Sequence, residues 1–123
     1  MCIRDSLCEA VYAELAAHFT APLDVERFCT DTRLRLETSG TDALALAGRA
    51  WAAYARRRPS GFTCAHCGAN QIVQCERCGE AIRARQHIVA DFLIGAHAQT
   101  HADALLTLDP RFYRSYFPDL QLR

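Results

Sequence analysis

Two pairs of cysteines with identical spacing constrain this 123-residue chain more than any other feature of its sequence. Cys64 and Cys67 form the first pair, Cys75 and Cys78 form the second, and a glycine directly follows each pair. Four thiolates carried on two tight turns suit tetrahedral zinc, with each sulfur about 2.3 Å from the metal. Glycine has no β-carbon and lets the backbone turn closely around the sulfurs. The spacing therefore predicts a closed, structural zinc site.

The alternative for these four cysteines is a pair of disulfides in a secreted domain. The sequence has no basic-then-apolar pattern typical of a secretory signal, and a bridge within a Cys-x-x-Cys pair is strained. We therefore expect a zinc ribbon over residues 63–82, with His66 as a solvent-facing spacer. The other cysteines, Cys2, Cys8 and Cys29, have no metal-ligand spacing and are expected to be small buried or free thiols.

Composition places the chain among globular domains. Half of its residues are hydrophobic, and 14 arginines without any lysine balance 14 acidic residues, so the formal net charge is zero. This balance argues against disorder and against a surface coated in positive charge for unspecific nucleic-acid binding. No stretch approaches 18 consecutive apolar residues. We expect one soluble, cytoplasmic domain with no membrane partner.

Helical and extended patterns alternate along the chain, which predicts an α/β sandwich with a mainly parallel sheet. Helices are expected over residues 7–18, 23–29, 41–58 and 87–102. Strands are expected over residues 33–37 and 105–108, the second of them buried and closed by an Asp-Pro turn. The apolar positions of the third helix predict a buried stripe formed by Leu44, Ala47, Trp51, Tyr54 and Ala55.

Three carboxylates stand among apolar neighbours and are candidates for chemistry: Glu14, Asp91 and Asp109. Asp109 follows the end of an expected strand, where open parallel sheets place their ligands. Asp91 begins a helix whose face carries Gly95 and Ala98, small residues that would let a backbone or a ligand approach. Should the three acids converge, their repulsion would require a cation, and hard oxygen ligands favour Mg²⁺ or Mn²⁺ over zinc.

Each acid also has a simpler explanation. Asp91 could cap a helix, Asp109 could begin a turn, and Glu14 could be a solvated position on an amphipathic helix. Spacing alone does not show that the three positions meet in space.

Two long segments of the chain resemble a known family. Residues 90–98, ADFLIGAHA, and residues 102–120, ADALLTLDPRFYRSYFPDL, resemble the C-terminal half of PIN-domain ribonucleases, most closely the VapC-type toxins of bacterial toxin–antitoxin pairs. Residues 11–15, VYAEL, resemble the middle acidic motif of that family. A subgroup of such domains carries a Cys-x-x-Cys ribbon just before the third acidic motif, which is where the ribbon of this chain lies.

The resemblance implies a three-layer sandwich and a nuclease. Glu14, Asp91 and Asp109 would be catalytic residues, three of four carboxylates that hold one or two Mg²⁺ or Mn²⁺ ions. The metal would generate hydroxide and orient it in line with an RNA phosphodiester. The implied partners are RNA, a neutralising antitoxin protein and a second copy of the chain in a homodimer.

The chain departs from the family pattern at its beginning. The family opens with an apolar strand that ends in Asp, whereas residues 1–6 of this chain look like a translated adaptor sequence. Asp5 is too close to Glu14 to be the first metal ligand. We therefore expect a non-native leader over 1–6 and a PIN-like domain over 7–123 that lacks its first strand. Because that strand would be central, we expect the chain as given to be unstable and nearly inactive.

Charge is divided unevenly along the chain. Residues 49–85 carry a formal charge of +5 and the remainder carries −5, and four thiolates on zinc would reduce the first value to about +3. This basic region suggests a path for the RNA backbone, with candidate contacts from Arg56, Arg57, Arg58, Arg83 and Arg85. The alternative is that the run of three arginines only complements a helix dipole.

A second functional hypothesis is a non-enzymatic zinc-ribbon module that binds nucleic acid or protein, or an inactive fragment of the nuclease.

Overall fold

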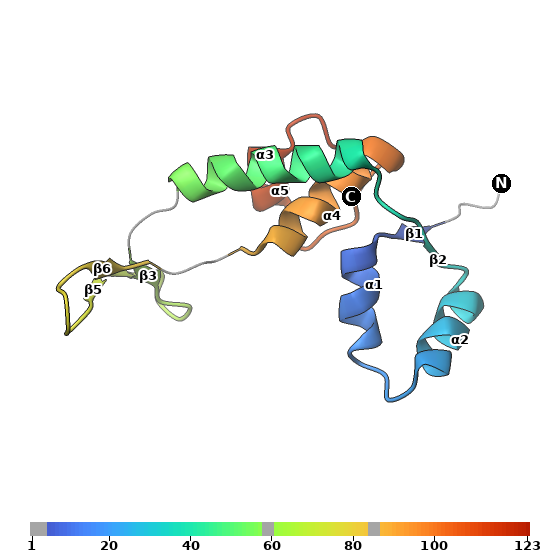
Figure 1. The fold of residues 1–123 in the computed structure, drawn as a ribbon, viewed down its shortest axis with the longest axis horizontal. Helices are drawn as coiled ribbons and strands as arrows, with labels where there is room; N and C mark the ends of the chain where they lie inside the picture. Colours follow the sequence, from blue (N-terminus) through green and yellow to red (C-terminus); the bar gives the residue numbers. More distant parts are fainter. Residues whose placement is uncertain (1–4, 58–60, 84–86) are drawn as a thin grey trace.

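The structure is a computed structural model that describes residues 5–57, 61–83 and 87–123. These residues form a small mixed α/β domain with five helices and short strands (Figure 1). The helices are α1 (Glu9–Ala16), α2 (Pro22–Thr32), α3 (Thr41–Arg57), α4 (Val89–His101) and α5 (Pro110–Tyr116). The strands are β1 (Ser6–Leu7), β2 (Arg35–Leu36), β3 (Phe62–Thr63), β4 (Asn70–Gln71), β5 (Val73–Gln74) and β6 (Ala81–Ile82). None of the described helices is long and apolar enough to cross a membrane.

The mainly parallel sheet expected from the sequence is not shown by the described residues. They contain three two-stranded sheets, of which β1–β2 is parallel and β3–β4 and β5–β6 are antiparallel. In the parallel pair, Ser6 lies opposite Arg35 and Leu7 lies opposite Leu36. Ser6, which the sequence assigned to a non-native leader, therefore takes part in a strand; residues 1–4 lie outside the described residues.

The prediction of a buried strand over 105–108 is wrong. Leu105 forms an isolated parallel bridge with Leu122, supported by a hydrogen bond of 2.9 Å from the backbone N–H of Arg123 to the carbonyl of Leu105. The segment is nevertheless open to solvent, because the Leu106 side chain is 84% exposed and that of Leu108 is fully exposed. An apolar sequence pattern does not ensure burial, because another element must also pack against the segment.

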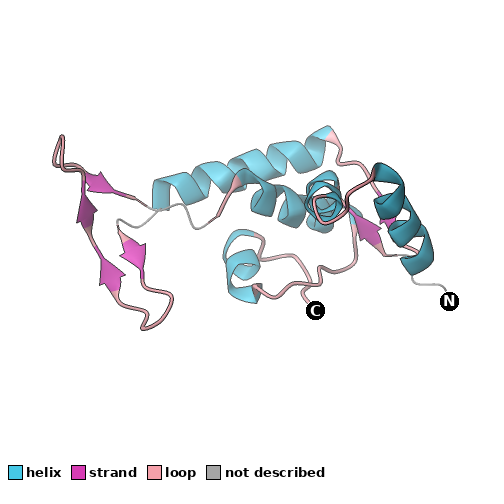
Figure 2. Ribbon diagram, turned by 90° about the horizontal axis from the view of Figure 1, so that it is seen from below, coloured by secondary structure: helices cyan, strands magenta, loops and turns pink. Residues whose placement is uncertain are grey.

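The core lies where α3 packs against α4, with α5 closing it from the other side (Figure 2). The expected stripe on α3 is partly wrong: Ala47 and Tyr54 are buried and Trp51 is half-buried, but Leu44 and Ala55 are exposed. Two further alanines of α3, Ala43 and Ala50, are buried instead. Small side chains on the contacting face let the two helix backbones approach closely, so alanines line the contact and the larger Leu44 lies outside it.

Gly95 on α4 packs directly against the ring of Phe117, and this contact leaves no room for a ligand there. A β-carbon at position 95 would overlap the Phe117 ring, whose side chain is 1% exposed. Gly95 was expected to leave space for a backbone or a ligand. The space is instead filled by the core side chain of Phe117.

We therefore expect Gly95→Ala to destabilise the fold by up to about 2 kcal/mol. Overpacking a core costs roughly 1–3 kcal/mol, and the better helix propensity of alanine offsets about 1 kcal/mol. Gly48→Ala on α3 is the matched control, because a β-carbon there meets nothing within 4 Å, and it should stabilise the fold by roughly 0.5–1 kcal/mol. Urea denaturation measures both; equal effects of the two substitutions would contradict the packing of Gly95 on Phe117.

Candidate functional site

The two Cys-x-x-Cys-Gly segments form two turns with the same backbone geometry. In the first turn, the N–H of Cys64 donates to the carbonyl of Ala69 at 2.8 Å, and the N–H of Gly68 donates back to the carbonyl of Cys64 at 2.9 Å. The second turn repeats these bonds from Cys75 and Gly79, each at 2.8 Å. Both glycines have positive φ, 74° and 77°, a conformation that disfavours residues with a β-carbon. The sequence repeat thus corresponds to a structural repeat.

The same turns favour the thiolate form of the first cysteine in each pair. The backbone N–H of Cys67, followed by that of His66 and by the Cys67 side chain, lowers the pKa of Cys64. The backbone N–H of Cys78 is the largest cause that lowers the pKa of Cys75 in the second turn. Zinc binds the deprotonated sulfur, so each turn holds its first cysteine in the form that a metal requires.

The described residues do not bring three or more His, Cys, Asp or Glu side chains into an arrangement that could hold a metal ion. Closure of the two turns on one zinc ion therefore stays a prediction. His66 is exposed, as expected of a spacer. Cys8 and Cys29 are buried free thiols, as the sequence predicts, and Cys2 lies outside the described residues.

Asp109 is held at the N-terminus of α5. Pro110 is the first helical residue, and the Asp109 side chain accepts a hydrogen bond of 3.3 Å from the N–H of Phe112. Its own N–H donates to the hydroxyl of Thr107 at 3.0 Å. Asp109 is exposed, so its carboxylate is oriented by the backbone while one oxygen is left to other ligands.

Asp91 lies in the first turn of α4, at the start of the helix. Its side chain accepts a hydrogen bond of 2.9 Å from the N–H of Ile88, and the Nδ1 atom of His87 lies 3.5 Å from the same oxygen. The side chains of His87 and Asp91 are 23% and 33% exposed. Asp91 therefore caps its helix and also has an imidazole beside it.

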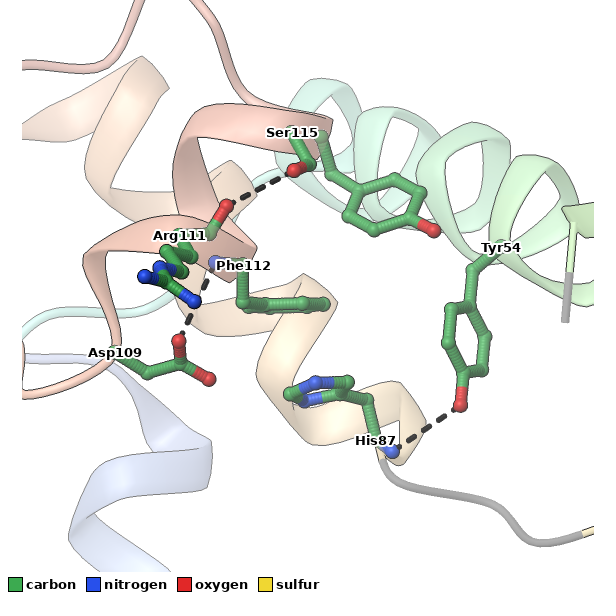
Figure 3. Close-up of a pocket in the computed structure, with 7 residues that line it drawn as sticks. Tyr54, His87, Asp109, Arg111, Phe112 and Ser115 are labelled. Atoms are coloured by element: carbon green, nitrogen blue, oxygen red, sulfur yellow. Dashed lines mark hydrogen bonds between the residues drawn. The ribbon is translucent and has the colours of Figure 1, made fainter. Parts of the chain in front are cut away.

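An open cleft of about 390 Å³ is lined by α5 and the residue before it, by His87 just before α4, and by Tyr54 of α3 (Figure 3). Asp109 and Arg111 lie at one side of it, and the rings of His87 and Phe112 lie stacked between them and Tyr54. Ser115 and Tyr116 complete the lining. Asp109 therefore lines the cleft, and Asp91 lies beside His87, which also lines it.

The three predicted acids act on one buried hydroxyl group. The pKa of Tyr113 is raised above its usual range, first by burial and then by the negative charges of Asp91 and Asp109, followed by Cys8 and Glu14. Tyr113 lies in α5 and is 6% exposed. The acids come from α1, α4 and the start of α5, separated by up to 95 positions in the sequence, yet their charges reach the same side chain.

The simpler roles considered for the acids are also present. Asp91 and Asp109 both cap helices, and Glu14 is an exposed residue of α1. Capping does not exclude chemistry, because a carboxylate has more acceptor sites than one backbone N–H uses. The catalytic role of all three residues stays a prediction.

The structure describes three of the five arginines that are predicted to contact RNA. Arg56 and Arg57 are exposed in the last turn of α3, where their charge also complements the helix dipole, and Arg83 is exposed just after β6. Arg58 and Arg85 lie outside the described residues.

A polar network that the sequence did not reveal connects α1 with α4. Ser39 donates to the Glu9 carboxylate from both its N–H and its hydroxyl, at 2.7 and 2.9 Å, and its Oγ lies 2.8 Å from Nδ1 of His97. The single hydroxyl proton goes to the carboxylate, which is acceptor-only, so neutral His97 carries its proton on Nδ1. The network therefore links the first turn of α1 to α4 through Ser39.

The same network makes stability depend on pH. His97 is 4% exposed, and its Nε2 atom makes no hydrogen bond within the described residues. Burial, followed by the nearby His101, lowers the pKa of His97 below its usual 6.5, although Glu37 and Glu9 oppose this. Just below pH 6.5 the unfolded chain therefore binds more protons than the folded chain, and folding is favoured by higher pH.

We expect the free energy of unfolding to fall as the pH is lowered from 7.5 to 5.5, with a slope of at most about 1.4 kcal/mol per pH unit. His97→Gln should flatten this dependence. His18→Gln, which alters an exposed histidine just after α1, should retain it. Urea denaturation across this pH range is the measurement, and an unchanged slope in His97→Gln would show that another group is responsible.

His87, Tyr113 and Ser39 are among the residues described above that sequence reasoning missed. His87 had a detectable signal, because it precedes Asp91 by four positions, the spacing at which helical side chains meet. Tyr113 and Ser39 had none, since their roles arise from contacts between segments far apart in the chain.

Comparison of the chain with protein-family models, with curated protein sequences and with solved structures finds no match.

Proposed function

We propose that this protein is a metal-dependent endoribonuclease of the PIN type, the toxin component of a toxin–antitoxin pair. The observation that supports the proposal is that Asp109 lines an open cleft and Asp91 contacts His87, which lines the same cleft, while the negative charges of Asp91, Asp109 and Glu14 all help to raise the pKa of Tyr113. A site that concentrates negative charge is suited to divalent cations.

The donor set fits magnesium or manganese better than zinc. All three candidate ligands are carboxylates, the oxygen donors that hard cations prefer. A bound Mg²⁺ or Mn²⁺ ion would activate water and stabilise the charge that develops on the phosphate during hydrolysis. The chain itself presents the carboxylates: Asp109 through its bond to the Phe112 N–H, Asp91 through the Ile88 N–H, and Glu14 on α1.

Other parts of the chain have supporting roles in this proposal. The hydrogen bonds among Glu9, Ser39 and His97 hold α1 against α4. The zinc ribbon, held by its four cysteines, carries a basic surface that guides the RNA backbone toward the acidic cleft. Exposed arginines that could take part are Arg56, Arg57, Arg77 and Arg83.

The finer fold and the partners are proposed on the resemblance described above. The parallel pair β1–β2 and the parallel bridge between Leu105 and Leu122 are consistent with parts of a three-layer PIN-like sandwich. RNA is the proposed substrate, and an antitoxin protein and a second copy of the chain are the proposed protein partners.

The second candidate is a non-enzymatic zinc-ribbon module. It is favoured by exposed apolar side chains on the two ribbon hairpins, where Ile72 is 67% exposed, Val73 44% and Ile82 42%. Such residues beside exposed arginines could bind a protein or a nucleic acid directly.

Binding and cleavage measured on the same variant separate the two candidates. Asp91→Asn keeps an oxygen that can accept from the Ile88 N–H, so the fold and RNA affinity should persist while cleavage in Mg²⁺ or Mn²⁺ is lost. For a binding module, no metal-dependent cleavage should be seen with either form. Cleavage that survives Asp91→Asn unchanged would remove that residue from the site.

A further inference from the structure

The imidazole of His97 has one nitrogen that the fold uses and one that it leaves without a partner. Nδ1 lies 2.8 Å from the Oγ atom of Ser39, whereas Nε2 makes no hydrogen bond to the residues that the structure describes. The side chain is 4% exposed, so bulk water does not replace the missing bond. A buried polar atom in this condition costs free energy, and a bound ion is one way in which proteins remove that cost.

The bonds on the other side of the ring leave Nε2 with its lone pair. The Ser39 hydroxyl donates to the Glu9 carboxylate at 2.9 Å, so Nδ1 of His97 carries the proton and donates it to Ser39 Oγ. Histidines that bind metals almost always donate their second N–H to a neighbouring acceptor, because that bond fixes the ring and strengthens the ligand. His97 therefore has the orientation and the proton position of a metal ligand.

A second imidazole lies beside this one. His101 follows four residues later as the last residue of α4, is exposed, and has its ring centroid 4.8 Å from that of His97. Two histidines at this spacing on one helix face can bind a zinc ion together. With each nitrogen about 2.0–2.1 Å from the metal and a bond angle of about 90–110°, the two ring centroids would be roughly 4.5–5.2 Å apart. The observed separation fits a shared ion.

The charges around the pair favour a cation. Burial and the nearby His101 lower the pKa of His97, whereas the negative charges of Glu37 and Glu9 act to raise it. A metal ion at Nε2 would meet the same two carboxylate charges and, unlike a proton, would bind the neutral ring. The four ribbon cysteines take no part in this pair. Asp91 lies at the other end of α4, about 15 Å away along the helix axis.

We propose that Nε2 of His97 and the ring of His101 bind a divalent transition-metal ion, with zinc as the expected ion and water completing its coordination. Imidazole suits zinc, nickel and copper, whereas Mg²⁺ prefers oxygen ligands. The part of the chain that the structure describes brings no third His, Cys, Asp or Glu ligand to the pair. Two protein ligands hold zinc more weakly than four thiolates do, so this ion should leave on desalting and return when free zinc is supplied.

The bound ion would stabilise a junction between distant segments. His101 ends α4, while the orienting bonds of His97 run through Ser39 to Glu9 at the start of α1. The site would open to solvent on the side of the exposed His101. Zinc would therefore fix the end of α4 against the start of α1, in addition to the role of zinc in the ribbon.

Equilibrium dialysis against Zn²⁺ tests this site in the full chain with its ribbon loaded. Excess Mg²⁺ in the buffer occupies oxygen-only sites and leaves the imidazoles to zinc. We expect about one further zinc ion per chain, as one histidine pair binds one ion. His101→Gln changes an exposed residue and should lose this ion without loss of the fold. His18→Gln, which changes another exposed histidine, should retain it.

Ser39→Ala tests the orienting bond without changing either ligand. Loss of such a bond typically weakens metal binding about 10–100-fold, and we expect a decrease in that range. Urea denaturation of each variant separates loss of zinc from loss of the fold. Nitrogen NMR of the histidine side chains should show the His97 Nε2 resonance shifting as the further ion binds.

Three results would overturn the inference. They are a folded, ribbon-loaded chain that takes up no further zinc, a further ion that persists in His101→Gln, and an ion that is lost equally in His18→Gln. The measurement contains no RNA, so its result does not depend on whether the protein is a nuclease.

Discussion

Replacing Cys64 or Cys75 with serine is expected to remove zinc from the protein and to unfold residues 61–83. The two ribbon hairpins have only two residues per strand, and their apolar side chains are exposed. With almost no core of its own, the ribbon is expected to draw its stability from zinc, which contributes about 10–16 kcal/mol in small zinc domains. No other single change in the chain should have so large a local effect.

Zinc content and amide exchange together measure this effect. The unaltered chain should retain about one zinc ion after desalting, as one four-cysteine site binds one ion, and its ribbon amides should be protected. Cys64→Ser should lose both properties. His66→Ala is the control, because this exposed residue lies between the first two cysteines and is not expected to bind the metal. Full zinc content in Cys64→Ser, or its loss in His66→Ala, would contradict a site made of four cysteines.

Asp91→Asn and Asp109→Asn are each expected to reduce RNA cleavage by at least about 100-fold. Each substitution removes one negative charge from the proposed cation site and leaves an oxygen that can accept the capping hydrogen bond, so the fold should persist. Losing a metal ligand costs several kcal/mol of transition-state stabilisation, and each 1.36 kcal/mol is a factor of ten in rate. Single-turnover cleavage at saturating protein gives the rates.

Glu14→Gln and Asp103→Asn complete this series. Glu14 exerts the smallest influence of the three acids on Tyr113, so Glu14→Gln should have a smaller effect that higher Mn²⁺ concentrations partly restore. Asp103 is exposed between α4 and α5 and is not among the groups that act on Tyr113. Asp103→Asn should therefore cleave at the unaltered rate. A loss in Asp103→Asn equal to that in Asp91→Asn would indicate an effect of overall charge and not of a defined site.

Local sequence signals predicted the elements that depend on local chemistry. The helix expected over 41–58 corresponds to α3, and its start at Thr41 is confirmed. The Cys-x-x-Cys-Gly repeats correspond to two turns with positive φ at Gly68 and Gly79. One local signal was misread: the Asp109–Pro110 pair was taken for a turn, whereas an N-capping Asp followed by Pro at the first helical position begins α5.

Burial and long-range contacts were less predictable, because they depend on which surfaces meet. Leu44 and Leu108 are apolar and fit the expected periodicity, yet both are exposed. The bonds of Ser39 to Glu9 and His97 span 30 and 58 positions, and no sequence pattern marks them. The combined influence of Asp91, Asp109 and Glu14 on the pKa of Tyr113 is a further long-range effect that no sequence pattern marks.

The metal dependence of RNA cleavage by zinc-loaded protein tests the proposed function most directly. Zinc-loaded chain in buffer stripped of other metals should leave a structured RNA with unpaired segments intact. Adding Mg²⁺ or Mn²⁺ should start cleavage in the unaltered protein, at the low rate expected of a site with three of its four carboxylates, and should start none in Asp91→Asn. The proposal is contradicted if the folded, zinc-loaded protein shows no cleavage with either ion, or if Asp91→Asn cleaves at the same rate.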